Sequence, residues 1–159
     1  MTRTLVVLTA MLLAGCPSAY QRTYDADMAR LEAQAQQQRQ QQEQLHAQAA
    51  RYAAVVYFPV GSSVVGTDGQ RELRWFVQQM QPYPQAHFLV QGFADTTGSE
   101  AKNQGLSLQR AQAVASYLTQ QGIDPSRMNV QGYGTGSPAA TNATVKGRGR
   151  NRRVEVTVQ

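Results

Sequence analysis

Cysteine and histidine are scarce in this sequence of 159 residues, which contains one Cys and two His. A single Cys excludes an internal disulfide and any zinc site built from paired cysteines. The two His, at positions 46 and 87, lie far apart and complete no metal or catalytic set. We therefore expect no metal, no cofactor and no enzymatic activity, with a hydrolase built on Asp95 and Glu100 as a minor alternative.

Long apolar runs are lacking as well. The run at residues 5–13 is much shorter than the roughly 20 residues that cross a bilayer as a helix. It follows Arg3 and ends in Leu13-Ala14-Gly15-Cys16, which resembles the bacterial lipobox, where the signal peptide is cut just before the Cys. We expect residues 1–15 to be a lipoprotein signal peptide; an ordinary secretory signal with a chance Cys is the alternative.

Cys16 is then an acylation site, carrying chains such as palmitate, and has no redox or metal role. Pro17 follows it, whereas Asp at this position retains enteric-type lipoproteins at the inner membrane. We therefore expect an anchor in the cell outer membrane, with the rest of the chain in the periplasm.

Negative charge is in deficit, since 15 Lys and Arg oppose 10 Asp and Glu. Five of the basic residues fall within positions 146–153. A basic cluster of this kind is typical of nucleic-acid binding or of a solvated face. Because the signal peptide directs the chain out of the cytoplasm, we expect no nucleic-acid partner.

Residues 16–52 have the composition of a tether. Nine of the fifteen residues 34–48 are Gln, and residues 19–52 contain no Gly or Pro. These residues are adequate helix formers, but Gln38 and Gln42 interrupt the apolar spacing of a coiled coil. We favour a solvated single helix or a partly disordered linker over a self-associating coil. Thirty helical residues would reach about 45 Å.

Residues 53–159 have the pattern of one α+β domain. Apolar or alternating runs predict strands at residues 53–60, 87–92, 128–132 and 153–158. Apolar residues at helical spacing predict one helix from Thr67 to before Pro82 and a longer one from Ser99 to Gln121. The expected fold is a βαβαββ sandwich, with two main helices packed on a mixed four-stranded sheet.

The longer helix carries an apolar arc and two polar residues at its border. Asn103 and Arg110 are seven residues apart and project within about 20° of each other. The face expected to pack on the sheet comprises Leu108, Ala111, Val114, Ala115 and Leu118. The aromatic residues expected in the core or at its margin are Tyr57, Phe58, Trp75, Phe76 and Tyr117.

Four motifs follow one another between residues 90 and 158. They are Gln91-Gly92-Phe93-Ala94-Asp95, the N-x-x-L-S-x-x-R-A-x-x-V pattern of residues 103–114, Gly132-Tyr133-Gly134, and Asn151-Arg152-Arg153-Val154-Glu155. In this order they resemble the OmpA C-terminal-like domain of peptidoglycan-associated lipoproteins. Family members often carry Asp after the Phe of the first strand, where this chain has Pro59.

The resemblance implies non-covalent binding of peptidoglycan through the diaminopimelate of the stem peptide. The free end of that residue is zwitterionic, with a carboxylate and an ammonium on one carbon. By resemblance, Arg110 binds the carboxylate in a bidentate fork and Asp95 binds the ammonium. Thr97, Asn103 and Arg152 match family positions that line the pocket. The expected function is to tether the outer membrane to the cell wall.

Three alternatives remain open at this point. Asp95 and Arg110 would look the same in sequence if they formed only a structural salt bridge. For Arg148, Asn151 and Arg153, a solvated face or an internal brace is the favoured interpretation. The chain could also serve as a subunit of an envelope machine, such as a Tol-like, efflux or secretion assembly, docking envelope protein partners through its N-terminal helix.

Overall fold

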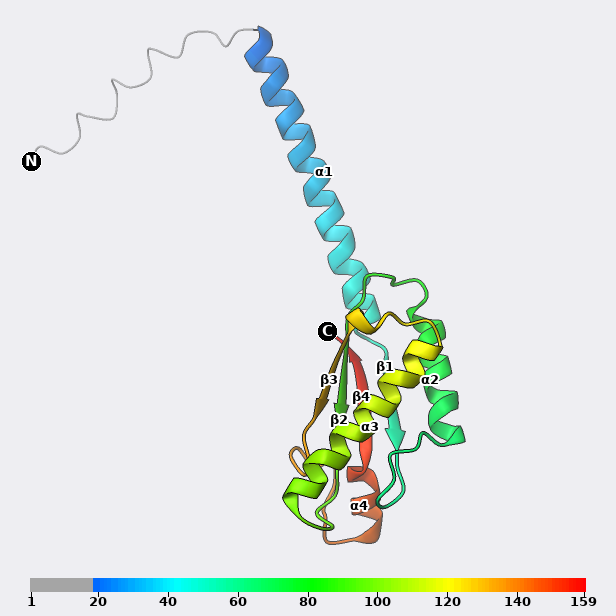
Figure 1. Ribbon diagram of the computed structural model, residues 1–159. Helices are drawn as coiled ribbons and strands as arrows, with labels where there is room; N and C mark the ends of the chain where they lie inside the picture. Colours follow the sequence, from blue (N-terminus) through cyan, green and yellow to red (C-terminus); the bar gives the residue numbers. More distant parts are fainter. Residues whose placement is uncertain (1–18) are drawn as a thin grey trace, which may run out of the picture. The chain divides into compact units, whose positions relative to one another are not determined.

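A four-stranded sheet, in the order β1-β4-β2-β3, forms the centre of the folded part of the chain (Figure 1). The computed structural model describes residues 19–159. The expected signal peptide, residues 1–15, and the expected lipidation site, Cys16, lie outside the described residues. The strands are β1 (Ala53–Tyr57), β2 (Phe88–Gly92), β3 (Met128–Gly132) and β4 (Arg153–Val158).

The sheet is mixed. Strand β4 pairs antiparallel with both β1 and β2, while β2 and β3 run parallel. The helices are α1 (Ala19–Ala49), α2 (Thr67–Met80), α3 (Glu100–Gln120) and α4 (Val145–Asn151), with a 3-10 turn at Pro125–Arg127. The predicted α+β class, a mixed four-stranded sheet with two main helices, is confirmed.

The core lies between one face of the sheet and helices α2 and α3. Alternate residues of the strands point to this face, because successive side chains of a strand project to opposite sides. The core residues from the two central strands are Phe88, Val90, Val154 and Val156, and all are buried. On α2, Leu73, Phe76 and Met80 are buried, as their spacing predicts.

Three apolar residues do not take the places predicted for them. Leu108 on α3 is 37% exposed, and its contact with the sheet at Gly132 is made by its backbone and Cβ. Tyr57 and Trp75 are 57% and 44% exposed. Tyr57 projects from the sheet face opposite the two helices, since it alternates with buried Val56.

Helix α1 is a single helix of 31 residues, about 46 Å long at about 1.5 Å per residue. Its residues are exposed except Ala49. The first of the chain's two compact units ends at Glu43, and the second runs from Gln44 to Gln159. The last turn of α1 therefore belongs to the second unit, where His46 bonds to the carbonyl of Gln159 and Ala49 joins the core. Over residues 19–159, no helix has both the length and the apolar character to cross a bilayer.

Helix α4 is an element that hydrophobic periodicity did not predict. The side chain of Thr144 caps its first turn by accepting a hydrogen bond from the backbone N–H of Gly147 at 3.0 Å. Gly147 and Gly149 weaken the helical pattern of this segment in the sequence. Close packing against the preceding loop holds the helix instead. Gly147 lies so near this loop that a Cβ there would be 1.9 Å from the carbonyl oxygen of Thr141.

Candidate functional site

Two glycines bring α3 close to the end of the sheet. Gly92 and Gly132 are paired in register at the ends of β2 and β3. A Cβ at Gly92 would lie 2.0 Å from the carbonyl oxygen of Ser107, and one at Gly132 would lie 2.6 Å from the backbone nitrogen of Leu108. The backbone of α3 therefore rests directly on the strands, and this close approach sets the position of Arg110, less than a turn further along the helix.

Arg110 is fully buried, with 0% of its surface exposed. Its Nε donates to the carbonyl of Ser62 at 2.8 Å, its Nη1 to the carbonyl of Phe93 at 3.2 Å and its Nη2 to the carbonyl of Pro59 at 3.1 Å. The guanidinium carbon also lies 5.4 Å from the centre of the Phe58 ring. A buried cation is thus held by carbonyl dipoles and an aromatic face, with no carboxylate in direct contact among the residues that the structure describes.

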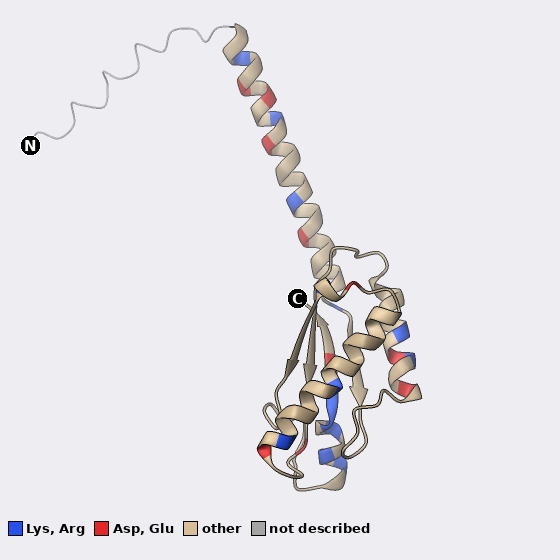
Figure 2. Ribbon diagram, in the orientation of Figure 1, with Lys and Arg blue, Asp and Glu red and all other residues tan. Residues whose placement is uncertain are grey.

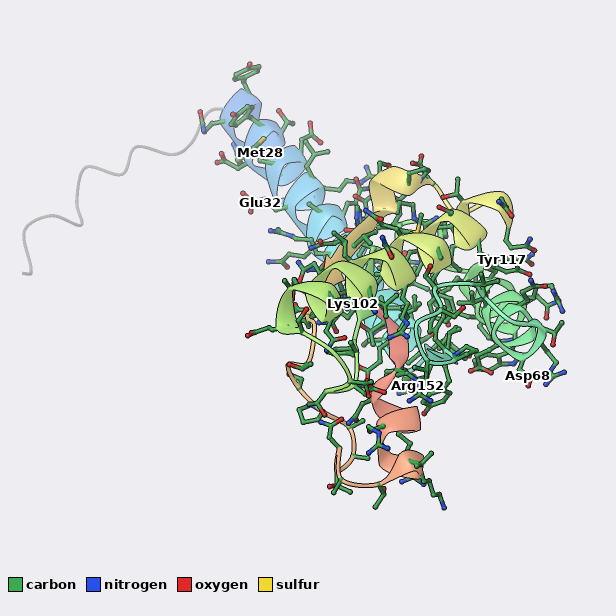
Figure 3. The ribbon with its side chains drawn as sticks, turned by 60° about the horizontal axis from the view of Figure 1, so that its bottom comes forward. Met28, Glu32, Asp68, Lys102, Tyr117 and Arg152 are labelled. Atoms are coloured by element: carbon green, nitrogen blue, oxygen red, sulfur yellow. The ribbon has the colours of Figure 1, made fainter. Side chains whose placement is uncertain are left out.

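Asp95 forms its ion pair with Arg152. Arg152 Nη1 donates to Asp95 Oδ2 at 2.8 Å, and Arg152 Nε donates to the carbonyl of Phe58 at 3.0 Å. The other carboxylate oxygen of Asp95 accepts the backbone N–H of Thr97 at 2.9 Å, which closes a tight turn after β2. Arg152 lies where α4 passes into β4 (Figure 3). Arg152, near the end of the domain, therefore contacts both Phe58 near its start and Asp95 after β2.

The three charged groups act on one another electrostatically. Burial, together with the nearby charge of Arg152, lowers the pKa of Arg110 to about 10, although Asp95 raises it. Burial raises the pKa of Asp95, but hydrogen bonds from Arg152 and Thr97 outweigh burial and bring this pKa below its usual value of 3.8. At neutral pH the site therefore holds two guanidinium cations and one carboxylate, an arrangement that favours a further anionic group.

The structure brings together most of the predicted site residues, in an arrangement that differs from the expected one. Asp95, Arg110 and Arg152 lie at the same end of the sheet, but Asp95 is paired with Arg152 rather than with Arg110. Thr97 is exposed beside Asp95. Asn103 is buried on α3, two turns before Arg110, and the two residues predicted at the border of the apolar arc are both buried.

Sequence reasoning missed the backbone groups that complete the site. Pro59 contributes its carbonyl to Arg110, as does Ser62. Backbone carbonyls leave no mark in a sequence. Phe93 is a further contact residue of Arg110 that the sequence does not indicate. Its carbonyl binds Arg110, while its ring lies 4.0 Å from the guanidinium carbon of Arg153 and stacks on Tyr133.

Comparison with known proteins places these residues in a family context. The model of the OmpA family matches residues 57–152. The probable lipoprotein YiaD of Escherichia coli (strain K12) is 40% identical over 103 residues, which are 65% of this chain and 47% of that protein. The peptidoglycan-binding protein ArfA of Mycobacterium tuberculosis (strain ATCC 25618 / H37Rv) is 39% identical over 98 residues, 62% of this chain and 30% of that protein.

The fold has solved counterparts. The crystal structure of the peptidoglycan-associated lipoprotein from Burkholderia pseudomallei matches with a TM-score of 0.64 and 30% sequence identity. The match covers 67% of this chain and 90% of that one. By contrast, the chain spans less than half of the length of the two curated relatives named above. The similarity is therefore a similarity of the domain.

Proposed function

The chain belongs to the OmpA family, and from this membership we propose that its domain binds peptidoglycan non-covalently through the diaminopimelate of the stem peptide. Asp95 binds the ammonium of the zwitterionic side-chain end. Arg110, together with Arg152, binds its carboxylate, while Thr97 and Asn103 line the pocket. The observation that carries this proposal is the meeting of two guanidinium cations with one buried carboxylate at one end of the sheet.

The surroundings of Arg110 support a role beyond bracing the fold. Three of the five guanidinium N–H groups donate to backbone carbonyls, which are neutral acceptors. A carboxylate adds the attraction of a full negative charge and can accept two parallel hydrogen bonds from one guanidinium, which a single carbonyl cannot do. A ligand carboxylate that replaces one of these carbonyls therefore gains a strong contact, and it also offsets the mutual repulsion of Arg110 and Arg152.

Asp95 can bind an ammonium without giving up its present partners. An ionised carboxylate offers about four lone-pair positions, and the hydrogen bonds from Arg152 and from the backbone and side chain of Thr97 leave about one of them open. The pKa of Asp95 is below its usual value, so the group is anionic throughout the neutral range. A fixed anion beside buried cations suits a ligand whose two opposite charges sit on the same carbon.

The test is sedimentation with purified sacculi, comparing the wild type with Asp95→Asn. The Asn side-chain oxygen can still accept the Thr97 N–H, so the turn is retained while the negative charge is removed. Asp68→Asn is the matched control, because Asp68 is an exposed carboxylate whose ion pair with Arg71 lies on α2. We expect Asp95→Asn to stay in the supernatant and Asp68→Asn to pellet like the wild type. Equal pelleting of all three proteins, with intact folds, would refute the proposal.

We propose further that Cys16 anchors the protein in the outer membrane and that residues 16–52 separate this anchor from the domain at residues 53–159. The length of α1 supports this, since its residues 19–43, which precede the second unit, provide roughly 38 Å of helical spacer. The test is labelling with palmitate followed by membrane fractionation. The wild type is expected to be labelled and to fractionate with the outer membrane, whereas Cys16→Ser is expected to be unlabelled and released. Labelling of the Ser variant would contradict this anchor.

A further inference from the structure

Helix α4 is a rigid support beside the site, although it is only seven residues long. The side-chain amide of Asn151 donates to the carbonyl of Ala140 and to the side chain of Asn142, both at 2.8 Å, and its oxygen accepts the N–H of Ala140 at 2.9 Å. Asn151 is fully buried. These hydrogen bonds hold the helix against the loop before it. The Cα positions of the basic residues on α4 are therefore fixed.

The basic residues of α4 divide between two opposite faces of the helix. Arg148 and Arg152 are four residues apart and share one face, because a helix turns about 100° per residue. Lys146 and Arg150 share the opposite face and are exposed. Since Arg152 reaches Asp95, the face with Arg148 is the one next to the candidate site. Figure 2 shows the basic residues gathered on α4 and the start of β4.

Arg148 is a cation of α4 on the side of the site, and it has no anionic partner among the described residues. Its Nη1 donates to the carbonyls of Asn142 at 2.8 Å and Ala143 at 3.4 Å, which orients the guanidinium. Within residues 19–159 it takes part in no ion pair, and its Nε and Nη2 have no hydrogen-bond partner. The side chain is partly exposed. Arg148 is therefore an oriented cation with free donors, about one helical turn from Arg152.

We propose that Arg148 binds a second carboxylate of the same stem peptide, namely the free α-carboxylate of the glutamate residue that precedes diaminopimelate. This inference rests on the proposed function. That glutamate is joined to diaminopimelate through its γ-carboxyl group, so its α-carboxylate remains ionised. A flexible chain of methylene and amide groups separates it from the zwitterionic end, and such a chain spans the rise of about 6 Å along the helix between Arg148 and Arg152. Stem peptides in which this carboxylate is amidated lose the contact.

The experiment is calorimetric titration with two synthetic tripeptides, L-Ala–γ-D-Glu–meso-diaminopimelate and the same peptide with isoglutamine in place of glutamate. Arg148→Gln is compared with Arg150→Gln, which removes the same charge from the opposite face of α4. We expect Arg148→Gln to weaken binding of the acidic peptide about tenfold and to leave binding of the amidated peptide unchanged. Arg150→Gln is expected to change neither Kd more than about twofold.

Three other outcomes decide against the proposal in different ways. If Arg148→Gln leaves the Kd of the acidic peptide unchanged, Arg148 is only an internal brace. If it weakens both peptides equally, it acts through the fold of the loop, and the thermal unfolding midpoint will have fallen as well. In both of these cases the wild type still binds, and the proposed function stands. Failure of the wild type to bind either peptide overturns the proposed function and this inference together.

Discussion

Replacement of Gly92 by Ala is expected to separate α3 from the sheet. It is also expected to disrupt the cage around Arg110, which is formed by the carbonyls of Pro59, Ser62 and Phe93. The added Cβ would lie 2.0 Å from the carbonyl oxygen of Ser107, 2.9 Å from its carbonyl carbon and 3.2 Å from the Cβ of Ala111. Restoring a 3.0 Å contact with the carbonyl oxygen requires a shift of 1.0 Å (3.0 − 2.0) between strand and helix backbones. Neither partner is a flexible side chain that could turn aside.

The shift has consequences for stability and for the site. Overpacking of this kind costs about 1–3 kcal/mol, and the rigid backbone contact places Gly92→Ala at about 3 kcal/mol. The hydrogen bonds of Arg110 to the carbonyls of Pro59, Ser62 and Phe93 are 2.8–3.2 Å long, so a movement of α3 by 1 Å would break at least one of them. Sacculus binding is therefore expected to fall as well.

The assay is urea denaturation followed by circular dichroism, with Gly105→Ala as the matched control. Gly105 is exposed on the same helix, and a Cβ there would meet nothing within 4 Å. Because Ala has the higher helix propensity, Gly105→Ala is expected to stabilise the protein by up to about 1 kcal/mol. If Gly92→Ala unfolds within about 0.5 kcal/mol of the wild type, α3 does not rest on the strand as described.

Three further predictions concern the cage, the carboxylate and the tether. Arg110→Met leaves three carbonyls without their donor and is expected to lower the free energy of unfolding by about 2–3 kcal/mol in the same assay; an unchanged value would mean that the cage does not stabilise the fold. The folded-state pKa of Asp95 is depressed, so its contribution to stability is present above pH 3.8 and is lost as the pH falls through the lower folded value. The difference in unfolding free energy between the wild type and Asp95→Asn should accordingly shrink in denaturation curves recorded below pH 3.8, and a difference independent of pH would refute the pairing. Deletion of residues 20–43 is expected to leave sacculus pelleting unchanged, because the second unit begins at Gln44; loss of pelleting would show that the helix itself takes part in binding.

The elements with strong local patterns could be predicted from the sequence almost to the residue. Strand β4 begins and ends where the alternation of Val154, Val156 and Val158 predicts, and β3 also matches. Strand β1 ends at Tyr57, earlier than the predicted residue 60, because the chain turns away at Pro59. Helix α4 escaped prediction because its two glycines oppose helix formation and its stability comes from the buried Asn151 clamp.

The sequence indicated which charged residues to expect together, but not how they pair. Family resemblance identified Asp95, Arg110 and Arg152, which the fold brings to one end of the sheet. Which arginine pairs with the carboxylate of Asp95 depends on where α4 ends. Helix α4 itself was not predicted. The burial of Arg110 depends on carbonyls of the segment from Pro59 to Ser62, about 50 residues away in sequence. Long-range backbone contacts of this kind have no periodicity that a sequence could reveal.

Binding of the diaminopimelate end is tested most directly by titrating the protein with L-Ala–γ-D-Glu–meso-diaminopimelate and with the same tripeptide carrying L-lysine in the third position. The two peptides differ only in the carboxylate at the end of the third residue's side chain. This is the group that we assign to Arg110 and Arg152. We predict that the diaminopimelate peptide binds at least tenfold more tightly, because the lysine peptide has no side-chain carboxylate for these guanidinium groups. Equal affinity for the two peptides would contradict it.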